Sequence, residues 1–433
     1  MTGLGVFGTR RRPALVAVVC CLFVGFAPPS VAASSTEGAL PTSGRGNALG
    51  AQVGFAAGDI DTGCLARDPT FCPRNTKNYT PAVWRVLEST HAALYMNIEY
   101  MADFGPPPPG SPQRTDVVPL IQTANHLGVP IVAWITLPVA EGTFFDEQNA
   151  FLAPKVIEDF HDWVATQRLA ISDTMLDLEI PTGYQPIADA LSGNPSTLEG
   201  MMRANVDPVG QCRAMLTYRD TISWAHEHGM SLSGTPVNFS IDDLADANMG
   251  MHDALDMPPY APGEFDHTWI QAYRTEPPVP PGTPVDFDFG SGYVAHYYKL
   301  AQHYLGPTGQ VGIGNIGIPP YDTLGPVVND VRMLAGMGAT SLFLYDFDAT
   351  INTFGVSGLQ AIIRAGSDPL GGAPLTTAES SITPEGNGAF KLFTTLNELA
   401  NVLTLAVTAS EGHPRQANAW PGGCGPMLPA PLR

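Results

Sequence analysis

Basic residues are scarce in this sequence. Its 433 residues include 21 Lys and Arg against 41 Asp and Glu, which gives a formal net charge of −20 with histidine neutral. Nucleic acid and anionic membrane surfaces repel a protein with this balance of charge. The composition therefore predicts no nucleic-acid partner, and it suits a protein that acts on neutral or cationic material.

Cysteines are also few. Two of the six lie in an N-terminal leader described below, and the remaining four lack the spacing of a zinc site. Cys64 and Cys72 lie in a Gly/Pro/Asp-rich loop, and we expect them to form a disulfide bond in an oxidising compartment. Cys212 and Cys424 are a second candidate pair. We predict no metal ion and no other cofactor.

Several signatures of other enzyme classes are missing. The sequence has no G-x-S-x-G elbow and no P-loop. The run Gly312–Gly317 matches the dinucleotide-binding fingerprint formally, but its glycines lie inside a strand-like run, and Pro319 and Pro320 follow in place of a helix. The run His226–His228 places its two imidazoles on different helix faces, which favours a solvated helix end over a metal site.

The first 33 residues resemble a secretory signal peptide. Arg10, Arg11 and Arg12 precede the apolar run Ala14–Ala27, and small residues follow where cleavage is expected. The sequence therefore predicts a secreted, extracellular protein with no stable membrane insertion once residues 1–33 are removed. Residues 34–50 are Ser/Gly-rich, and we expect a flexible mature N-terminus there.

Eight alternations of strand-like and helical runs follow. Several helical runs end at a glycine just before the next strand, a common helix stop. This pattern predicts an α/β fold, a (β/α)8 TIM barrel over residues 51–366, whose site lies at the carboxyl ends of its strands. An open, doubly wound sheet is the alternative. The predicted strands are Gln52–Ala56, Ala92–Tyr100, Pro130–Leu137, Thr174–Ile180, Met230–Val237, His267–Arg274, Gln310–Ile318 and Thr340–Asp346.

The helical runs have apolar residues three and four positions apart. The expected helices are Pro81–Thr90, Asp116–Leu127, Pro154–Leu169, Val209–His228, Tyr293–Leu305 and Leu324–Met337, with a less regular connection at Ile241–Asp256. After the barrel we expect a linker and an extra helix that packs back on it, within residues 367–408. A Gly/Pro-rich tail over residues 409–433 is predicted to be disordered.

Two acids interrupt the apolar run Ile171–Pro181. In a strand, residues two apart share a face, so Asp177 and Glu179 are predicted to project together, with Met175 beside them. Burying both acids costs several kcal/mol unless their face opens onto a wet cleft. A strand end at the mouth of a barrel is such a place. The alternative is a strand that ends at the surface with solvated acids.

The other predicted strand ends carry polar and aromatic residues too. Carboxylates, amides and aromatic rings together are typical of carbohydrate sites, where one carboxylic acid protonates the leaving oxygen. Glu179, beside a like charge, is the candidate general acid. The candidate substrate-binding residues are Asp59, Asn97, Glu99, Trp134, Asn238, Gln271, Tyr345, Asp346 and Asp348.

The run Phe265–Pro278, FDHTWIQAYRTEPP, resembles the sixth strand of glycoside hydrolase family 18 enzymes of the class III chitinase type. NIEYMADFG, LSGTPVN and SLFLYDFD resemble the second, fifth and eighth strands of that family, and they occur in the same order along this chain. Asp177 and Glu179 match the D-x-E that ends the family's D-G-x-D-x-D-x-E signature. The resemblance implies that Glu179 is the acid, that Asp177 orients a substrate acetamido group, and that Tyr273 donates a hydrogen bond to that group.

Four positions depart from the family pattern. Met175 stands in place of the earlier acid, Ser172 and Asp173 replace the leading Asp-Gly, and Tyr345 replaces the eighth-strand Trp. D-x-E also occurs in family 25 lysozyme-like barrels.

The resulting prediction is a secreted glycoside hydrolase that cleaves a polysaccharide or a cell-wall glycan. One alternative is another glycosidase type that pairs Glu179 with Glu99, Asp346 or Asp348. The other is a non-catalytic barrel that binds sugar or protein.

Overall fold

The computed structural model describes most of the middle of the chain. The described residues are 50–58, 74–107, 109, 112–181, 200, 204–246, 249–259, 264–274, 288–368, 398, 400 and 402. The chain divides into two units, Met1–Ala48 and Leu49–Arg433, and all described residues belong to the second. The predicted signal peptide, the Cys64–Cys72 bridge and the C-terminal tail lie outside the described residues.

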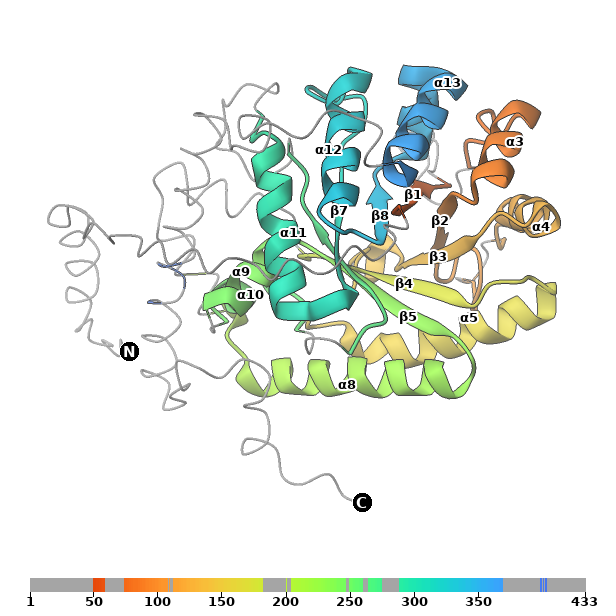
Figure 1. Cartoon of the computed structure of the whole chain (residues 1–433). Helices are drawn as coiled ribbons and strands as arrows, with labels where there is room; N and C mark the ends of the chain where they lie inside the picture. The colour runs from red at the N-terminus through yellow and green to blue at the C-terminus, as the bar shows by residue number, and fades with distance from the viewer. Residues whose placement is uncertain are drawn as a thin grey trace, which may run out of the picture. The chain divides into compact units, whose positions relative to one another are not determined.

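Parallel strands form a closed barrel in the order in which they occur along the chain (Figure 1). This closure confirms the (β/α)8 barrel and excludes the open, doubly wound sheet. The strands are β1 Gln52–Ala57, β2 Ala93–Glu99, β3 Ile131–Thr136, β4 Asp173–Leu178, β5 Ser231–Pro236, β6 Thr268–Gln271, β7 Gly309–Ile313 and β8 Ser341–Leu344.

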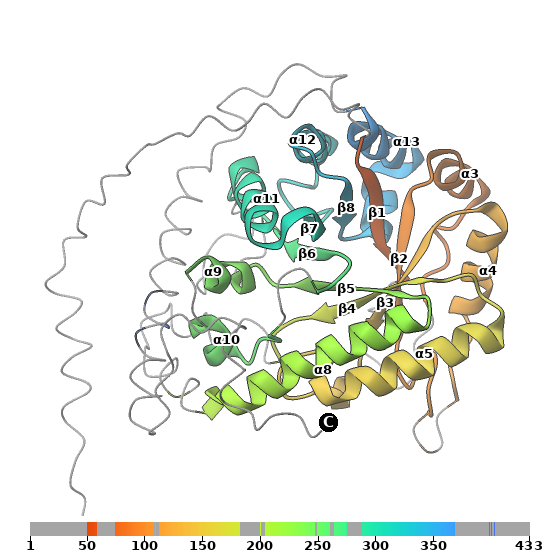
Figure 2. The ribbon, with the colours of Figure 1, turned by 60° about the horizontal axis from the view of Figure 1, so that its bottom comes forward.

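Helices surround the strands, as Figure 2 shows from one end of the barrel. Their bounds are α3 Pro81–Thr90, α4 Val117–Leu127, α5 Ala153–Gln167, α8 Pro208–Glu227, α9 Phe239–Asp246, α10 Gly250–Leu255, α11 Ser291–Leu305, α12 Leu324–Gly336 and α13 Phe347–Ser367. Short 3-10 helices occupy Val139–Glu141, Ala150–Leu152 and Gly306–Thr308.

The helices begin and end where the local sequence provides caps. Thr80 precedes Pro81 and accepts a hydrogen bond from the backbone of α3, and Asp207 does the same for α8 through two backbone N–H groups. Helix α4 ends at Gly128, which adopts a left-handed conformation at φ 69° and bonds back to the last turn. These capped ends set the points at which the chain turns into the next strand.

The fifth connection, expected to be less regular at Ile241–Asp256, contains two short helices, α9 and α10. The last helix and the end of β7 differ from expectation. Helix α13 follows β8 and was not among the expected helices; Asp346 caps its start. Strand β7 ends at Ile313, earlier than predicted, because the chain then turns and Ile316 N–H bonds to the carbonyl of Tyr345 beyond β8.

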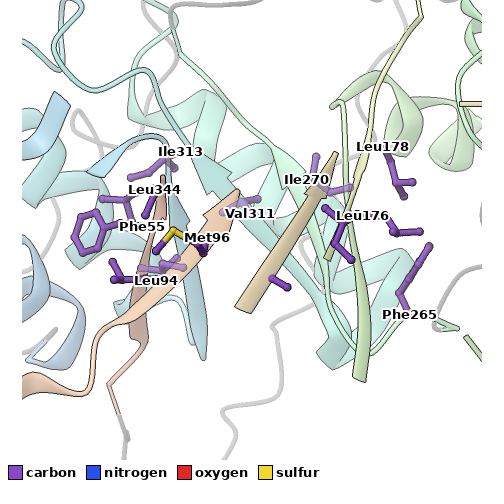
Figure 3. Packing of buried hydrophobic residues seen from close by; sticks show 14 of the residues in the cluster. Phe55, Leu94, Met96, Leu176, Leu178, Phe265, Ile270, Val311, Ile313 and Leu344 are labelled. Carbon is purple, nitrogen blue, oxygen red and sulfur yellow. The ribbon is translucent and has the colours of Figure 1, made fainter. Parts of the chain in front are cut away.

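The buried apolar residues of the barrel form two clusters. The larger lies between strands and helices and includes residues on the outward strand faces, several of which Figure 3 shows packed together. The smaller fills the barrel interior. Its members are Ala56, Ala93, Tyr95, Trp134, Met175, Trp269 and Phe343. Because strand residues alternate between the two faces, the position of Met175 in the interior places Asp177 on the same inward face.

The predicted C-terminal helix is described at three positions. Glu398, Ala400 and Val402 are helical, and Ala400 is fully buried in the larger apolar cluster. Cys212 is buried on α8, and its pairing with Cys424 stays a prediction because Cys424 lies outside the described residues.

Candidate active site

Asp177 is a buried acid at the carboxyl end of β4. Its side chain points inward, above Met175, and pairs in register with Thr235 of β5. The residue is only 1% exposed, and among the described residues neither carboxyl oxygen accepts a hydrogen bond of good geometry. A buried carboxylate without a partner is costly, so this group favours its neutral, protonated form.

Two causes raise the pKa of Asp177 well above its ordinary value. Burial is the larger, because it penalises the charged form, and the nearby carboxylate of Glu179 adds like-charge repulsion. The indole of Trp134 acts in the opposite direction and favours the charged form in part. The net direction is upward, so Asp177 takes up a proton more readily than an ordinary aspartic acid does.

Glu179 lies just beyond the end of β4, held by the chain around it. Its N–H donates to the carbonyl of Phe145 at 3.2 Å, and the N–H of Phe145 donates to the carbonyl of Asp177 at 2.8 Å. Gln271 at the end of β6 donates from Nε2 to Glu179 Oε1 at 2.9 Å and to the carbonyl of Thr235 at 3.1 Å. The amide therefore orients the Glu179 carboxyl from across the barrel mouth.

A row of aromatic rings begins at Trp134, whose indole acts on Asp177. The rings of Tyr273 and Tyr345 stack at 6.1 Å between centroids, and Trp134 meets Tyr345 edge-on at 6.0 Å. A Cβ placed on Gly314 would lie 3.2 Å from the Tyr273 ring and 3.1 Å from the carbonyl oxygen of Tyr345, so a glycine there makes room for this pair. Half-buried rings next to carboxyl groups suit the apolar faces of sugars.

The wall formed by β2 carries Asn97 and Glu99, and both contact protein groups. The amide of Asn97 donates to Thr136 Oγ1 at 3.3 Å. Glu99 accepts a hydrogen bond from Arg114 at 3.0 Å. Burial raises the pKa of Glu99, although the guanidinium of Arg114 acts to lower it. Glu99 is thus an acid with its own counterion.

A buried ion network lies behind Glu99, and the sequence analysis did not identify it. Arg74 donates to both oxygens of Asp103, at 2.8 and 2.6 Å, and to Asp116 at 2.8 Å. Arg114 joins the same Asp103 at 3.0 Å. The side chains of Arg74 and Asp103 are fully buried. The spacing of these residues along the chain gives no periodic signal, since the loop after β1 and the loop after β2 meet only in the folded barrel.

Three of the predicted substrate-binding residues make structural contacts. Asn238 follows β5 by two positions and donates to the hydroxyl of Tyr293 on α11 at 2.9 Å. Asp346 caps α13 by accepting a bond from Ala349 N–H at 2.6 Å. Asp348 accepts a bond from Asn78 at 2.5 Å, and burial raises its pKa.

The structure does not describe every predicted site residue. Asp59 lies outside the described residues. Within the described ranges, no group of three or more His, Cys, Asp or Glu side chains is arranged to hold a metal ion. The same ranges contain no helix that is long and apolar enough to cross a membrane.

No protein-family model matches the chain, and no curated protein matches it in sequence. Among solved structures, the chain is similar to the PgaB glycoside hydrolase domain of Bordetella bronchiseptica, with 11% identity, 72% of this chain and 99% of that chain covered, and a TM-score of 0.41. It is also similar to the family 18 chitinase ChiB of Flavobacterium johnsoniae, with 10% identity, coverage of 73% and 95%, and a TM-score of 0.42.

A third similar structure is a broad-specificity endoglucanase from an uncultured bacterium, with 11% identity, coverage of 74% and 95%, and a TM-score of 0.42. At these values the similarities carry no conclusion about what this chain does. Its function is therefore argued below from its own residues.

Proposed function

We propose that this protein is a secreted glycoside hydrolase that cleaves a polysaccharide or a cell-wall glycan, with Glu179 as the general acid. The observation that carries the proposal is the pair Asp177 and Glu179 at the carboxyl end of β4. One acid is buried and favours its protonated form, and the other is oriented by Gln271. Active sites of (β/α)8 enzymes lie at this end of the barrel.

The two acids have different roles in the proposed reaction. Glu179 enters the reaction protonated, gives that proton to the glycosidic oxygen as the bond to the anomeric carbon breaks, and regains a proton from the water that adds to this carbon. Asp177 holds a proton and lies on the same inward face, where a neutral carboxyl can donate a hydrogen bond to an acetamido oxygen. Tyr273 supplies a second donor to that group, and its ring packs on Tyr345. The proposed substrate therefore contains an N-acetylhexosamine.

A sugar-binding barrel without catalytic activity is the second candidate. Its basis is Met175, which occupies the inward position below Asp177 and is fully buried. A thioether there cannot exchange a proton with Asp177, so the lower part of the site has no acid–base function. In this case the same rings and carboxyls would hold a glycan without cleaving it.

Glu179→Gln separates these functions. The amide keeps the shape of the side chain but cannot donate the proton, so we expect kcat to fall roughly 10²–10⁴-fold while substrate still binds. The assay uses labelled chitin, peptidoglycan, arabinan and galactan oligomers. Glu158→Gln, on the exposed side of α5, is the matched control and should retain wild-type rates.

Two outcomes would reject the catalytic proposal. If Glu179→Gln cleaves every substrate as fast as the wild type, Glu179 is not the acid. If the wild type cleaves none of these oligomers yet binds one of them, the protein is a sugar-binding barrel.

A further inference from the structure

Arg274 is a buried cation just beyond the carboxyl end of β6, and only 5% of the residue is exposed. Its guanidinium donates to both oxygens of Asp288, at 2.7 and 2.5 Å, and to Asp330 of α12 at 2.6 Å. It also donates to Ser291 Oγ, at the start of α11, over a longer distance of 3.4 Å. One side chain therefore connects the end of β6 to the neighbouring helices α11 and α12 (Figure 1).

The same guanidinium contacts the loop after β7. Its Cζ lies 5.3 Å from the centroid of the Tyr321 ring, and the Tyr321 hydroxyl donates at 2.5 Å to the oxygen of Asp330 that Arg274 binds. The carbonyl of Tyr321 accepts a hydrogen bond from Gly317 N–H at 2.9 Å. Arg274 thus packs against the loop that follows β7 as well as the chain that follows β6.

Tyr273 and Arg274 point to opposite sides of the chain. The Tyr273 ring packs on Tyr345 at the barrel mouth, whereas the Arg274 side chain reaches the helices outside the barrel. Gln271, two residues before Tyr273, shares the inward direction and bonds to Glu179. The inner side of this stretch therefore carries two site residues, and Arg274 holds its outer side.

The sheet ends close to Tyr273. Ala272 N–H still donates to the carbonyl of Gly312 in β7 at 2.8 Å, but the bond from Phe289 N–H to the carbonyl of Arg274 is long, at 3.4 Å. Beyond Ala272 the strand ladder no longer fixes the backbone. The short ionic contacts of Arg274 fix it there, and they limit how far the Tyr273 ring can move.

We infer that Arg274 is a positioning residue for the proposed hydrolysis. Its ionic contacts hold the backbone so that the Tyr273 hydroxyl meets the acetamido group of the substrate in the transition state. A misplacement of about 1 Å in such a group can cost about a hundredfold in rate. Because the contact matters most in the transition state, the loss falls on kcat more than on KM. The inference rests on the proposed function, since it assigns Arg274 to the same reaction.

The test compares two buried arginines changed in the same way. Arg74 also binds two aspartates, but it lies on the wall formed by β2. Arg274→Lys and Arg74→Lys each keep the charge and lose the fork that binds a carboxylate through two bonds. Both should lower Tm. Only Arg274→Lys should lower kcat on labelled chitin oligomers, about tenfold or more, with KM within about threefold of the wild type. Equal kcat values in the two variants would overturn the inference.

A double variant shows whether Arg274 acts through Tyr273. Tyr273→Phe has already lost the hydroxyl, so adding Arg274→Lys should lower kcat by less than about threefold further. Losses that multiply in the double variant would leave Arg274 a structural role alone and overturn the inference. If Arg274→Lys does not fold, Asp288→Asn breaks the same fork from the carboxylate side. It should lower kcat several-fold, and an unchanged kcat there would also overturn the inference.

Fluorine NMR provides a measurement that does not depend on cleavage. In protein labelled with 3-fluorotyrosine, the resonance of Tyr273 is the one that Tyr273→Phe removes. Arg274→Lys should shift or broaden this resonance, because the ring is no longer held in one place, and Arg74→Lys should leave it unchanged. A Tyr273 resonance with unchanged position and width in Arg274→Lys would overturn the inference.

The two proposals fail in different ways. If the wild type cleaves no oligomer but the Tyr273 resonance responds to Arg274→Lys and not to Arg74→Lys, the glycosidase proposal fails, and Arg274 still positions Tyr273. If the wild type cleaves chitin oligomers and Arg274→Lys cleaves them with the same kcat, only the positioning role fails.

Discussion

Two walls of the barrel mouth carry acids in opposite settings. On the β2 wall, Glu99 and Asp103 lie within hydrogen-bond distance of Arg74 or Arg114. On the β4 wall, Asp177 is as buried as Asp103, and it has no ion-pair partner in the described part of the chain; the indole of Trp134 is the group that favours its charged form. Asp103 and Asp177 are buried to a similar extent, so the counterion is the main difference between these two acids.

The pKa shifts of Asp103 and Asp177 have opposite directions because only Asp103 has guanidinium groups beside it. The guanidinium groups of Arg74 and Arg114 overcome the effect of burial and lower the pKa of Asp103. Burial and like charge raise the pKa of Asp177. Removing one partner from a buried ion pair destabilises the fold, whereas a buried acid without a cation is itself costly and is available for chemistry. The predictions below test this division from the larger effect to the smaller.

Arg74→Met should have the largest effect, on stability. It removes the cation that holds Asp103 and Asp116, and a buried ion pair that loses one partner costs about 3–5 kcal/mol. The free energy of unfolding in urea measures this loss. Arg85→Met, on the exposed side of α3, is the control and should change stability by less than about 0.5 kcal/mol. A loss below about 1 kcal/mol for Arg74→Met would show that the network does not stabilise the β2 wall.

Asp177→Asn should lower the activity and change the stability separately, so the two effects can be measured on one variant. The amide cannot act as an acid or hold the substrate as the carboxyl does, so we expect a roughly hundredfold loss in kcat/KM on N-acetylated oligomers. Substrates that lack the N-acetyl group should be poor for the wild type. Wild-type rates in Asp177→Asn would show that this carboxyl has no part in the reaction.

The stability of Asp177→Asn should depend on pH in a defined direction. The folded protein raises the pKa of Asp177 above its value of 3.8 in the unfolded chain. The stability that the protonated Asp177 contributes to the wild type is therefore fully present only below about pH 3.8. Between there and the raised pKa it loses stability as pH rises. Asn does not titrate, so the difference between the Tm of the variant and that of the wild type should shift in favour of the variant as the pH rises above about 4. A constant difference in Tm across this range would contradict the raised pKa.

The barrel could be predicted from the sequence because most of its helices and strands have a recognisable pattern in their own residues. Helical runs that end at glycines such as Gly128 recur before the strands, and the two-residue period placed Asp177 and Met175 on one face. These signals depend on neighbours in the chain, so they survive without knowledge of the fold. The predicted ends of strands were less accurate, as the early end of β7 shows.

The partners of the site residues could not be predicted. Asn238, a predicted substrate-binding residue, lies two residues beyond β5 and donates to the hydroxyl of Tyr293, a contact that its sequence position did not indicate. The bond from Gln271 to Glu179 joins β6 to β4 across 92 positions, and no periodicity encodes such a contact. Whether an acid has an arginine beside it depends on which loops meet, and that is a property of the closed barrel.

Tyr273→Phe should have a smaller effect than Asp177→Asn. It removes one hydroxyl donor and leaves the ring packed on Tyr345, so the loss of transition-state stabilisation should be about 1–3 kcal/mol. The ratio of kcat/KM values on N-acetylated oligomers measures it. Tyr304→Phe on α11 is the control, because its hydroxyl bonds only to the carbonyl of Ala245 among the described residues. If Tyr273→Phe lowers kcat/KM by no more than Tyr304→Phe does, the Tyr273 hydroxyl does not contact the substrate.

Glu99→Gln should have the smallest effect and decides between two glycosidase types. Arg114 keeps Asp103 as a partner after the change, so stability should fall by less than about 1 kcal/mol. If Asp177 is the partner of Glu179, the neutralised acid on the β2 wall has no role in proton transfer, and kcat should stay within about threefold of the wild type. A glycosidase that pairs Glu179 with Glu99 needs both carboxyls, and its kcat would fall roughly 10²–10⁴-fold. Oligomer cleavage by Glu99→Gln, measured beside Glu179→Gln, thus shows whether an acid with an arginine counterion can take part in the reaction.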